Sequence, residues 1–152
     1  MDPDARSSPA AVGDIRLGFG PMDEVHAEFV AAIETLLSAP DSEVGAAFSA
    51  LERCTREHFE GEERWMAETD FPARDCHADE HAAVLRSVVG VSERVASGEF
   101  DPARALASAL LDWLPAHADY MDAALAHWMC KLRFGGKPVV LRRGASGAAD
   151  SC

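Results

Sequence analysis

Four stretches of this sequence repeat apolar residues at steps of three and four positions, with only short breaks between them. They run over residues 22–38, from Ser42 to the break at Thr69, over residues 74–97 and over residues 101–132. This period places apolar side chains along one face of an α-helix. Pro40, Pro72 and Gly98 mark the breaks. Because short connections make successive helices antiparallel, the pattern predicts an all-α fold, an antiparallel up-down-up-down four-helix bundle.

The length of 152 residues suits a single domain that buries a core without disulfides or a structural metal. We expect an N-terminal arm over residues 1–19, the bundle over residues 20–132 and a flexible tail over residues 133–152. The start of the chain has neither the basic residues nor the apolar run of a secretory signal, and no later stretch is apolar enough to span a membrane. These features predict a cytoplasmic protein.

The net charge argues against two classes of partner. Lys and Arg number 14 against 26 Asp and Glu, which gives a formal net charge of −12. Such a chain repels nucleic acid and anionic membranes, and we expect neither as a partner. The four cysteines form no Cys-x-x-Cys pair, which disfavours a zinc ribbon or a thioredoxin-type site.

The inward-facing stripes carry groups that a bundle core normally excludes. They are one carboxylate and several imidazoles: His26, His58, Glu62, His77, His81 and His117. A carboxylate on a core-facing stripe is rarely buried unless it is paired or bound to a metal. Neutral imidazoles and ionised carboxylates are the forms that bind a metal cation. The stripes therefore predict a metal centre inside the bundle.

Two pairs of these residues have the spacing of neighbours on one helix face. His58 and Glu62 are four residues apart, and so are His77 and His81. Alone, each pair could be a surface pair or a core histidine bonded to the backbone, but together on inward stripes they favour a shared site. A mixed site that includes Cys54 or Cys76 is a weaker alternative.

A third pair, His117 and Asp122, conflicts with regular helix geometry. A spacing of five residues turns the second side chain about 140° away from the first. A π-bulge would bring both side chains towards one face, and Pro115 removes a helical hydrogen bond just before the pair. The sequence therefore predicts a distortion of the last helix near residues 111–122.

The full set resembles the ligand pattern of the hemerythrin family, which has one histidine on the first helix, then His-x-x-x-Glu, His-x-x-x-His and His-x-x-x-x-Asp on the next three. The matching residues are His26, His58, Glu62, His77, His81, His117 and Asp122. The resemblance covers roughly residues 18–132, and Pro115 departs from its pattern.

The resemblance implies a cofactor of two non-haem iron ions (Fe2+/Fe3+) joined by a bridging oxo or hydroxo group. One iron would be bound by His77, His81 and His117 and the other by His26 and His58, with Glu62 and Asp122 bridging both. The second iron would keep one open position for dioxygen. An apolar pocket formed by Leu114, Phe29 and Trp113 would exclude water from that position.

Reversible dioxygen binding, for storage, delivery or sensing through a separate protein partner, is therefore the expected function, without catalysis. A di-iron enzyme with peroxidase, ferroxidase or nitric oxide-handling activity is the alternative. A ferritin-like oxidase is disfavoured because the chain has no Glu-x-x-His pair. A dizinc hydrolase is disfavoured because seven protein ligands leave little room for both a metal-bound water and a substrate.

Overall fold

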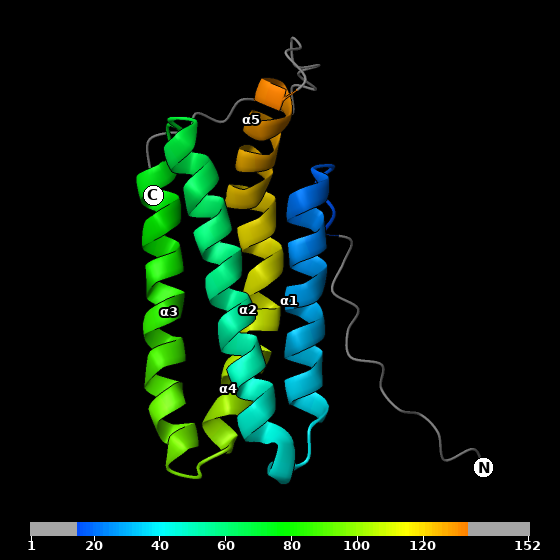
Figure 1. Ribbon diagram of the computed structural model, residues 1–152, viewed down its shortest axis with the longest axis vertical. Helices are drawn as coiled ribbons and strands as arrows, with labels where there is room; N and C mark the ends of the chain where they lie inside the picture. Colours follow the sequence, from blue (N-terminus) through cyan, green and yellow to red (C-terminus); the bar gives the residue numbers. More distant parts are fainter. Residues whose placement is uncertain (1–14, 134–152) are drawn as a thin grey trace, which may run out of the picture.

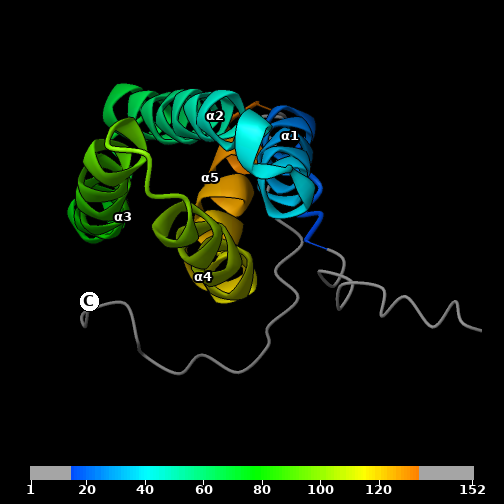
Figure 2. The same cartoon turned by 90° about the horizontal axis from the view of Figure 1, so that it is seen from below.

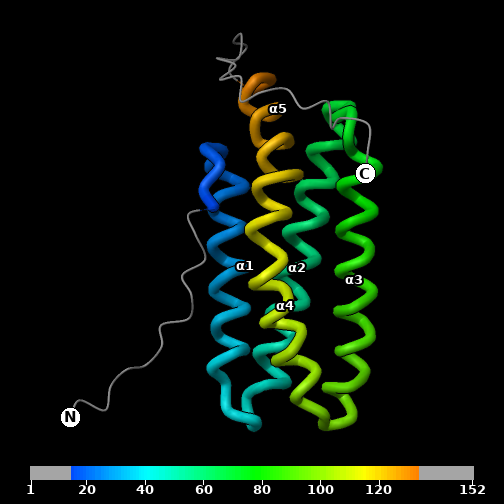
Figure 3. Tube along the Cα trace, turned by 180° about the vertical axis from the view of Figure 1, so that it is seen from behind, coloured from blue at the N-terminus to red at the C-terminus, as the bar shows by residue number. Residues whose placement is uncertain are grey.

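The computed structural model describes residues 15–133, and the regular elements in this range are all helical. They are α1 (Gly20–Ser38), α2 (Asp41–Glu68), α3 (Arg74–Ala96), α4 (Asp101–His117), the π-helical segment η1 (Ala118–Asp122) and α5 (Ala123–Arg133). Figure 3 shows that α4, η1 and α5 run on as one continuous rod. The predicted all-α four-helix bundle is confirmed.

Each rod packs against its neighbours in the sequence, and the last rod closes the bundle against the first. Helix α1 contacts α2 and α4, and α3 contacts the same two helices. Successive rods run antiparallel (Figure 1), and the end view shows them around a common axis (Figure 2). All four rods therefore direct one face of side chains towards that axis.

The breaks between helices follow from local chemistry. Pro21 lies in the first turn of α1, where its missing N–H costs no helical hydrogen bond. Gly98 ends α3 with a φ of +83°, a left-handed conformation that glycine adopts without strain. Its N–H donates to the carbonyl of Val95 at 3.0 Å, and the N–H of Glu99 donates to that of Arg94 at 3.0 Å. These bonds satisfy carbonyls at the end of the helix.

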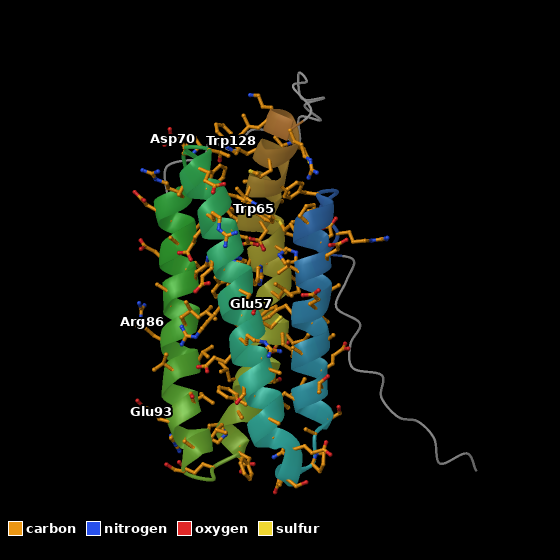
Figure 4. All side chains as sticks on the ribbon, in the orientation of Figure 1. Glu57, Trp65, Asp70, Arg86, Glu93 and Trp128 are labelled. Carbon is orange, nitrogen blue, oxygen red and sulfur yellow. The ribbon has the colours of Figure 1, made fainter. Side chains whose placement is uncertain are left out.

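Two apolar clusters fill the bundle at different heights. The larger cluster consists of Phe29, Ile33, Leu36, Val44, Phe48, Leu51, Val88, Ala103, Ala107, Leu110 and Leu114. The smaller cluster consists of Phe19, Met22, Met66, Phe71, Leu125 and Ala126. Trp65 and Trp128, which pack against the smaller cluster, mark its end of the bundle in Figure 4. The predicted ligands lie between the two clusters, as the order of residues along each rod shows.

On α1, for example, His26 lies between Met22 of the smaller cluster and Phe29 of the larger one. On α2, His58 and Glu62 lie between Leu51 of the larger cluster and Met66 of the smaller one. The bundle therefore holds a polar layer that is closed above and below by apolar side chains.

Part of the predicted arm and most of the predicted tail, residues 1–14 and 134–152, lie outside the described residues. Residues 15–19 lie against the bundle: Phe19 is buried, and the carboxylate of Asp23 accepts hydrogen bonds from the N–H groups of Leu17 at 2.7 Å and Gly18 at 3.1 Å. No helix within the described range combines the length and the apolar character needed to cross a bilayer.

Candidate metal centre

All the predicted ligand side chains are buried in the polar layer, with exposed fractions of 2% or less. They are His26 from α1, His58 and Glu62 from α2, His77 and His81 from α3, His117 from α4 and Asp122 from η1. The structure thus brings together every member of the sequence-predicted set.

The ligand atoms form two overlapping groups, and within each group all atoms lie within 4.8 Å of one another. One group contains Glu62, His77, His81, His117 and Asp122, and the other contains His26, His58, Glu62 and Asp122. Glu62 and Asp122 belong to both groups and can therefore be shared by two ions. Among the described residues, neither Cys54 nor Cys76 joins a group, so the geometry gives the mixed Cys/His alternative no support.

Asp122 presents one carboxylate oxygen to each group. Its Oδ1 lies 2.9 Å from Nε2 of His77 and 3.0 Å from Nε2 of His117. Its Oδ2 lies 2.9 Å from Nε2 of His26, on the other side. This is the arrangement that a carboxylate bridging two cations requires.

Glu62 divides its oxygens in the same way. Its Oε1 lies 2.8 Å from Nε2 of His58, whereas its Oε2 lies 3.2 Å from Nε2 of His81 and 3.3 Å from Nε2 of His77. The two carboxylates come from different elements, Glu62 from α2 and Asp122 from η1, and each contacts both groups of imidazoles.

The backbone of η1 makes the contribution of Asp122 possible. The π-helical segment Ala118–Asp122 adds a residue to the turn that follows His117, so a spacing of five brings both side chains to one face. Pro115 lies inside α4, just before this segment. The predicted distortion of the last helix is confirmed.

Many atoms of the centre are buried without a hydrogen-bond partner among the described residues. They include Nε2 of His26, His77, His81 and His117, Oε2 of Glu62 and both carboxylate oxygens of Asp122. Each such atom costs about 1–3 kcal/mol if nothing else binds it. These nitrogens and oxygens lie close together but are not aligned for hydrogen bonds, as expected when their lone pairs face shared cations. The imidazole-rich set, with two carboxylates, suits iron or zinc.

A family model described as the hemerythrin HHE cation binding domain matches residues 18–128, which include the whole set. The chain belongs to the hemerythrin family. Over 117 residues it is 32% identical to a protein named bacteriohemerythrin from Ralstonia nicotianae (strain ATCC BAA-1114 / GMI1000). That match covers 77% of this chain and 85% of the relative. No solved structure matches the chain significantly.

Aromatic rings pack against the imidazoles of the candidate metal centre. Phe59 stacks on His81 with centroids 3.9 Å apart and planes 4° apart, and Trp113 stacks on His117 with centroids 4.2 Å apart. Phe29 meets the ring of His58 edge to face at 5.3 Å. The predicted pocket residues Phe29 and Trp113 therefore contact opposite groups of the centre.

Leu114, the third predicted pocket residue, is fully buried in the larger cluster together with Phe29. The sequence prediction did not assign Phe59 or Glu80, whose carboxylate contacts His117, to the site. Phe59 directly follows His58 in the sequence, and this position next to a candidate ligand could have indicated it. The contact of Glu80 joins α3 to α4, and no spacing along the chain indicates it.

In the metal-free centre, the two carboxylates favour the protonated form of two of the imidazoles. Burial opposes protonation of His26, but close contacts with Asp122 and Glu62 outweigh burial and raise the pKa of His26 to about 9. The same balance raises the pKa of His77 to about 9. Burial lowers the pKa of His81 to about 4, because its contact with Glu62 does not offset the loss of solvent.

The pKa values of the two carboxyl groups move in the opposite direction. Burial would raise both, but contacts with the surrounding imidazoles hold the pKa of Glu62 well below its usual range and lower that of Asp122. At neutral pH the metal-free centre therefore contains two carboxylates balanced by protonated His26 and His77. A metal pair must displace these protons, since a ring nitrogen that carries a proton cannot bind a cation.

Proposed function

We propose that this protein holds two non-haem irons and binds dioxygen reversibly, for oxygen storage, delivery or sensing. The observation that carries the proposal is the pair of overlapping ligand groups, with Glu62 and Asp122 each presenting one oxygen to each group. Similarity to a protein named bacteriohemerythrin supports it. Two bound irons would supply the reversible electron transfer that dioxygen binding needs.

The two groups supply unequal numbers of imidazoles. His77, His81 and His117 would hold one iron, and His26 and His58 the other, with the carboxylates common to both. The side of His26 and His58 has one nitrogen ligand fewer. Within an iron pair held in this way, the open position for dioxygen would therefore lie on that side.

Apolar side chains next to that side would keep water away. Phe29 is fully buried with its ring edge against His58, and Leu114 is fully buried in the same cluster. Trp113 stacks on His117, which belongs to the other group. Within the proposal, Phe29 and Leu114 exclude water from the dioxygen side, whereas Trp113 packs against the opposite one.

Cycles of oxygen exposure test the function. The purified protein is loaded with iron, reduced without oxygen, exposed to oxygen and then purged, while the visible absorption of the iron centre is recorded. We expect an absorption band that appears with oxygen and disappears on purging through several cycles. A single irreversible conversion would contradict reversible binding and favour the peroxidase, ferroxidase or nitric oxide-handling alternative.

Metal analysis of Glu62→Ala tests the centre itself. Wild-type protein should contain about two irons per chain, and we expect Glu62→Ala to lose the iron pair because the substitution removes one oxygen from each group. Glu57→Ala is the matched control, since Glu57 is exposed on the same helix (Figure 4). Retention of both irons by Glu62→Ala would contradict the bridging assignment.

A further inference from the structure

The outer ring nitrogens of the proposed ligands differ in their surroundings. Nδ1 is buried without a hydrogen-bond partner among the described residues in His26, His58, His77 and His81. In His117, by contrast, Nδ1 donates a hydrogen bond to Oε2 of Glu80 at 3.1 Å. Of the five imidazoles, His117 is thus the one that the described residues tie to a carboxylate outside the bridging pair.

His117 stands at the junction of the regular helix α4 and the π-helical segment, and its own backbone angles are helical (φ −62°, ψ −46°). It follows Pro115 by two residues. Because proline has no N–H, a helical hydrogen bond is missing in the turn before His117. The backbone sets where the side chain begins, and contacts from other side chains set how the imidazole ring is turned.

Two side chains supply such contacts. Trp113 stacks on one face of the His117 ring with planes 23° apart, which limits its tilt. Glu80 reaches across from α3 to the ring edge, which limits rotation in the ring plane. Glu80, Trp113 and His117 also line a surface cavity of about 260 Å³. The Glu80 contact therefore lies between the buried centre and the surface.

We propose that Glu80 is a positioning residue that orients His117 for metal binding and increases its strength as a ligand. When Nδ1–H is donated to a carboxylate, the ring takes the tautomer whose Nε2 lone pair is free for a cation. The negative charge on the acceptor also makes the ring a stronger electron donor. If iron is bound, a stronger donor would favour the ferric over the ferrous ion in the group that contains His117. The inference rests on the metal centre of the proposed function but not on dioxygen binding.

Zinc affinity tests the positioning role without redox chemistry. Zinc is titrated into metal-free wild-type, Glu80→Ala, Glu80→Gln and Asp79→Ala proteins in competition with a chromophoric chelator. We expect Glu80→Ala to bind zinc about 10- to 100-fold more weakly, the usual effect of removing an outer partner of a ligating histidine. Glu80→Gln keeps an oxygen acceptor and should recover part of the affinity. Asp79 is exposed on the same helix and serves as the control.

Two further measurements separate this role from a general loss of stability. Glu80 is 35% exposed, so the thermal unfolding midpoint of the metal-free protein should not change in any variant. In the iron-loaded proteins, Glu80→Gln should raise the reduction potential at unchanged iron content, because the amide is a neutral acceptor.

Equal zinc affinity in Glu80→Ala and Asp79→Ala would overturn the proposal. A fall in metal-free stability that accounts for the whole loss of affinity would also overturn it. The zinc result holds whether or not the protein binds dioxygen. Failure of the Glu80 role is therefore distinguishable from failure of the proposed function.

Discussion

Helices α2 and α3 are neighbours that supply two proposed ligands each, but different contacts hold them in the bundle. Helix α3 buries only His77, His81 and Val88, and residues such as Arg86 and Glu93 point away from the bundle (Figure 4). Helix α2 buries a continuous stripe of Val44, Phe48, Leu51, Thr55, His58, Phe59, Glu62 and Met66. Most of the fully buried contacts of α3 therefore belong to the polar layer.

The difference indicates what metal binding does for the fold. Full burial of an apolar side chain contributes about 1.5–3 kcal/mol to the stability of the fold. Helix α2 buries such side chains from Val44 to Met66. On α3, Val84, Val91 and Val95 are only partly buried against the larger cluster. We therefore expect that metal binding by His77 and His81 supplies much of the free energy that holds α3 against the rest of the bundle.

The largest effect is expected from Phe48→Ala on α2. Phe48 is 2% exposed in the larger cluster, and its truncation should lower the free energy of unfolding by about 3–5 kcal/mol. The loss should be the same with and without metal, because Phe48 belongs to the larger apolar cluster and to neither candidate ligand group. Urea unfolding measures both states, with Val89→Ala on the exposed side of α3 as the control. A loss of stability seen only in the metal-loaded protein would contradict the view that the apolar contacts of α2 stabilise the fold independently of metal.

Removal of metal should affect α3 most. Binding at a free metal concentration a hundred times Kd stabilises the folded state by about 2.7 kcal/mol. In the metal-free protein, hydrogen exchange should show faster opening of amides near His77 and His81 than of amides near Phe48. Equal acceleration in both helices would contradict a metal-dependent attachment of α3.

Metal uptake should depend on pH through His26 and His77. Their pKa values of about 9 mean that both hold protons at pH 7, and the metal pair must release them. Apparent affinity should therefore rise with pH, by roughly tenfold per pH unit for each displaced proton, and level off above pH 9. His81, with a pKa of about 4, should release none at neutral pH. Proton release measured in weakly buffered zinc titrations checks this, and uptake without release would contradict the charge pattern.

The folding stability of the metal-free protein should fall as the pH rises, in contrast to its apparent metal affinity. A histidine whose pKa is raised on folding stabilises the fold below its unfolded pKa, and this stabilisation is lost as the pH rises through the folded value. For His26 and His77 the loss falls between pH 6.5 and about 9. Urea unfolding of metal-free protein across that range should show falling stability, whereas stability that stays constant would contradict the raised pKa values.

The fold and the buried positions of the candidate ligands could be predicted from sequence, because both follow from local patterns. Helical periodicity gives the rods, and the spacing of five between His117 and Asp122 already requires an extra residue in the turn. Periodicity shows which face of a helix points inwards but not how deeply that face is buried, so it does not indicate that α3 buries fewer apolar side chains than α2. The contact between Glu80 and His117 depends on how α3 and α4 pack, which no single stretch encodes.

The smallest effect is expected from deleting Tyr120, and it tests whether η1 serves only to align ligands. Tyr120 is 73% exposed within the π-helical segment. Deleting it shortens the spacing between His117 and Asp122 to four, and a regular α-helix places residues four apart on the same face. Asp122 would then still contact His77, one of the attachments of α3. We expect the iron content to remain at about two per chain, with little change in stability.

Deleting Asp112 is the matched control for that experiment. Asp112 is also exposed, but it lies in the regular part of α4, where removal of one residue turns the two parts of the rod by about 100° relative to each other. After that rotation, His117 and Asp122 could not face the centre while the residues of α4 before Asp112 remain packed in the larger cluster. We therefore expect this deletion to abolish iron binding. If both deletions lost iron equally, the alignment of His117 with Asp122 would depend on more than the number of residues between them. The π-helical turn would then contribute its own backbone geometry to the centre.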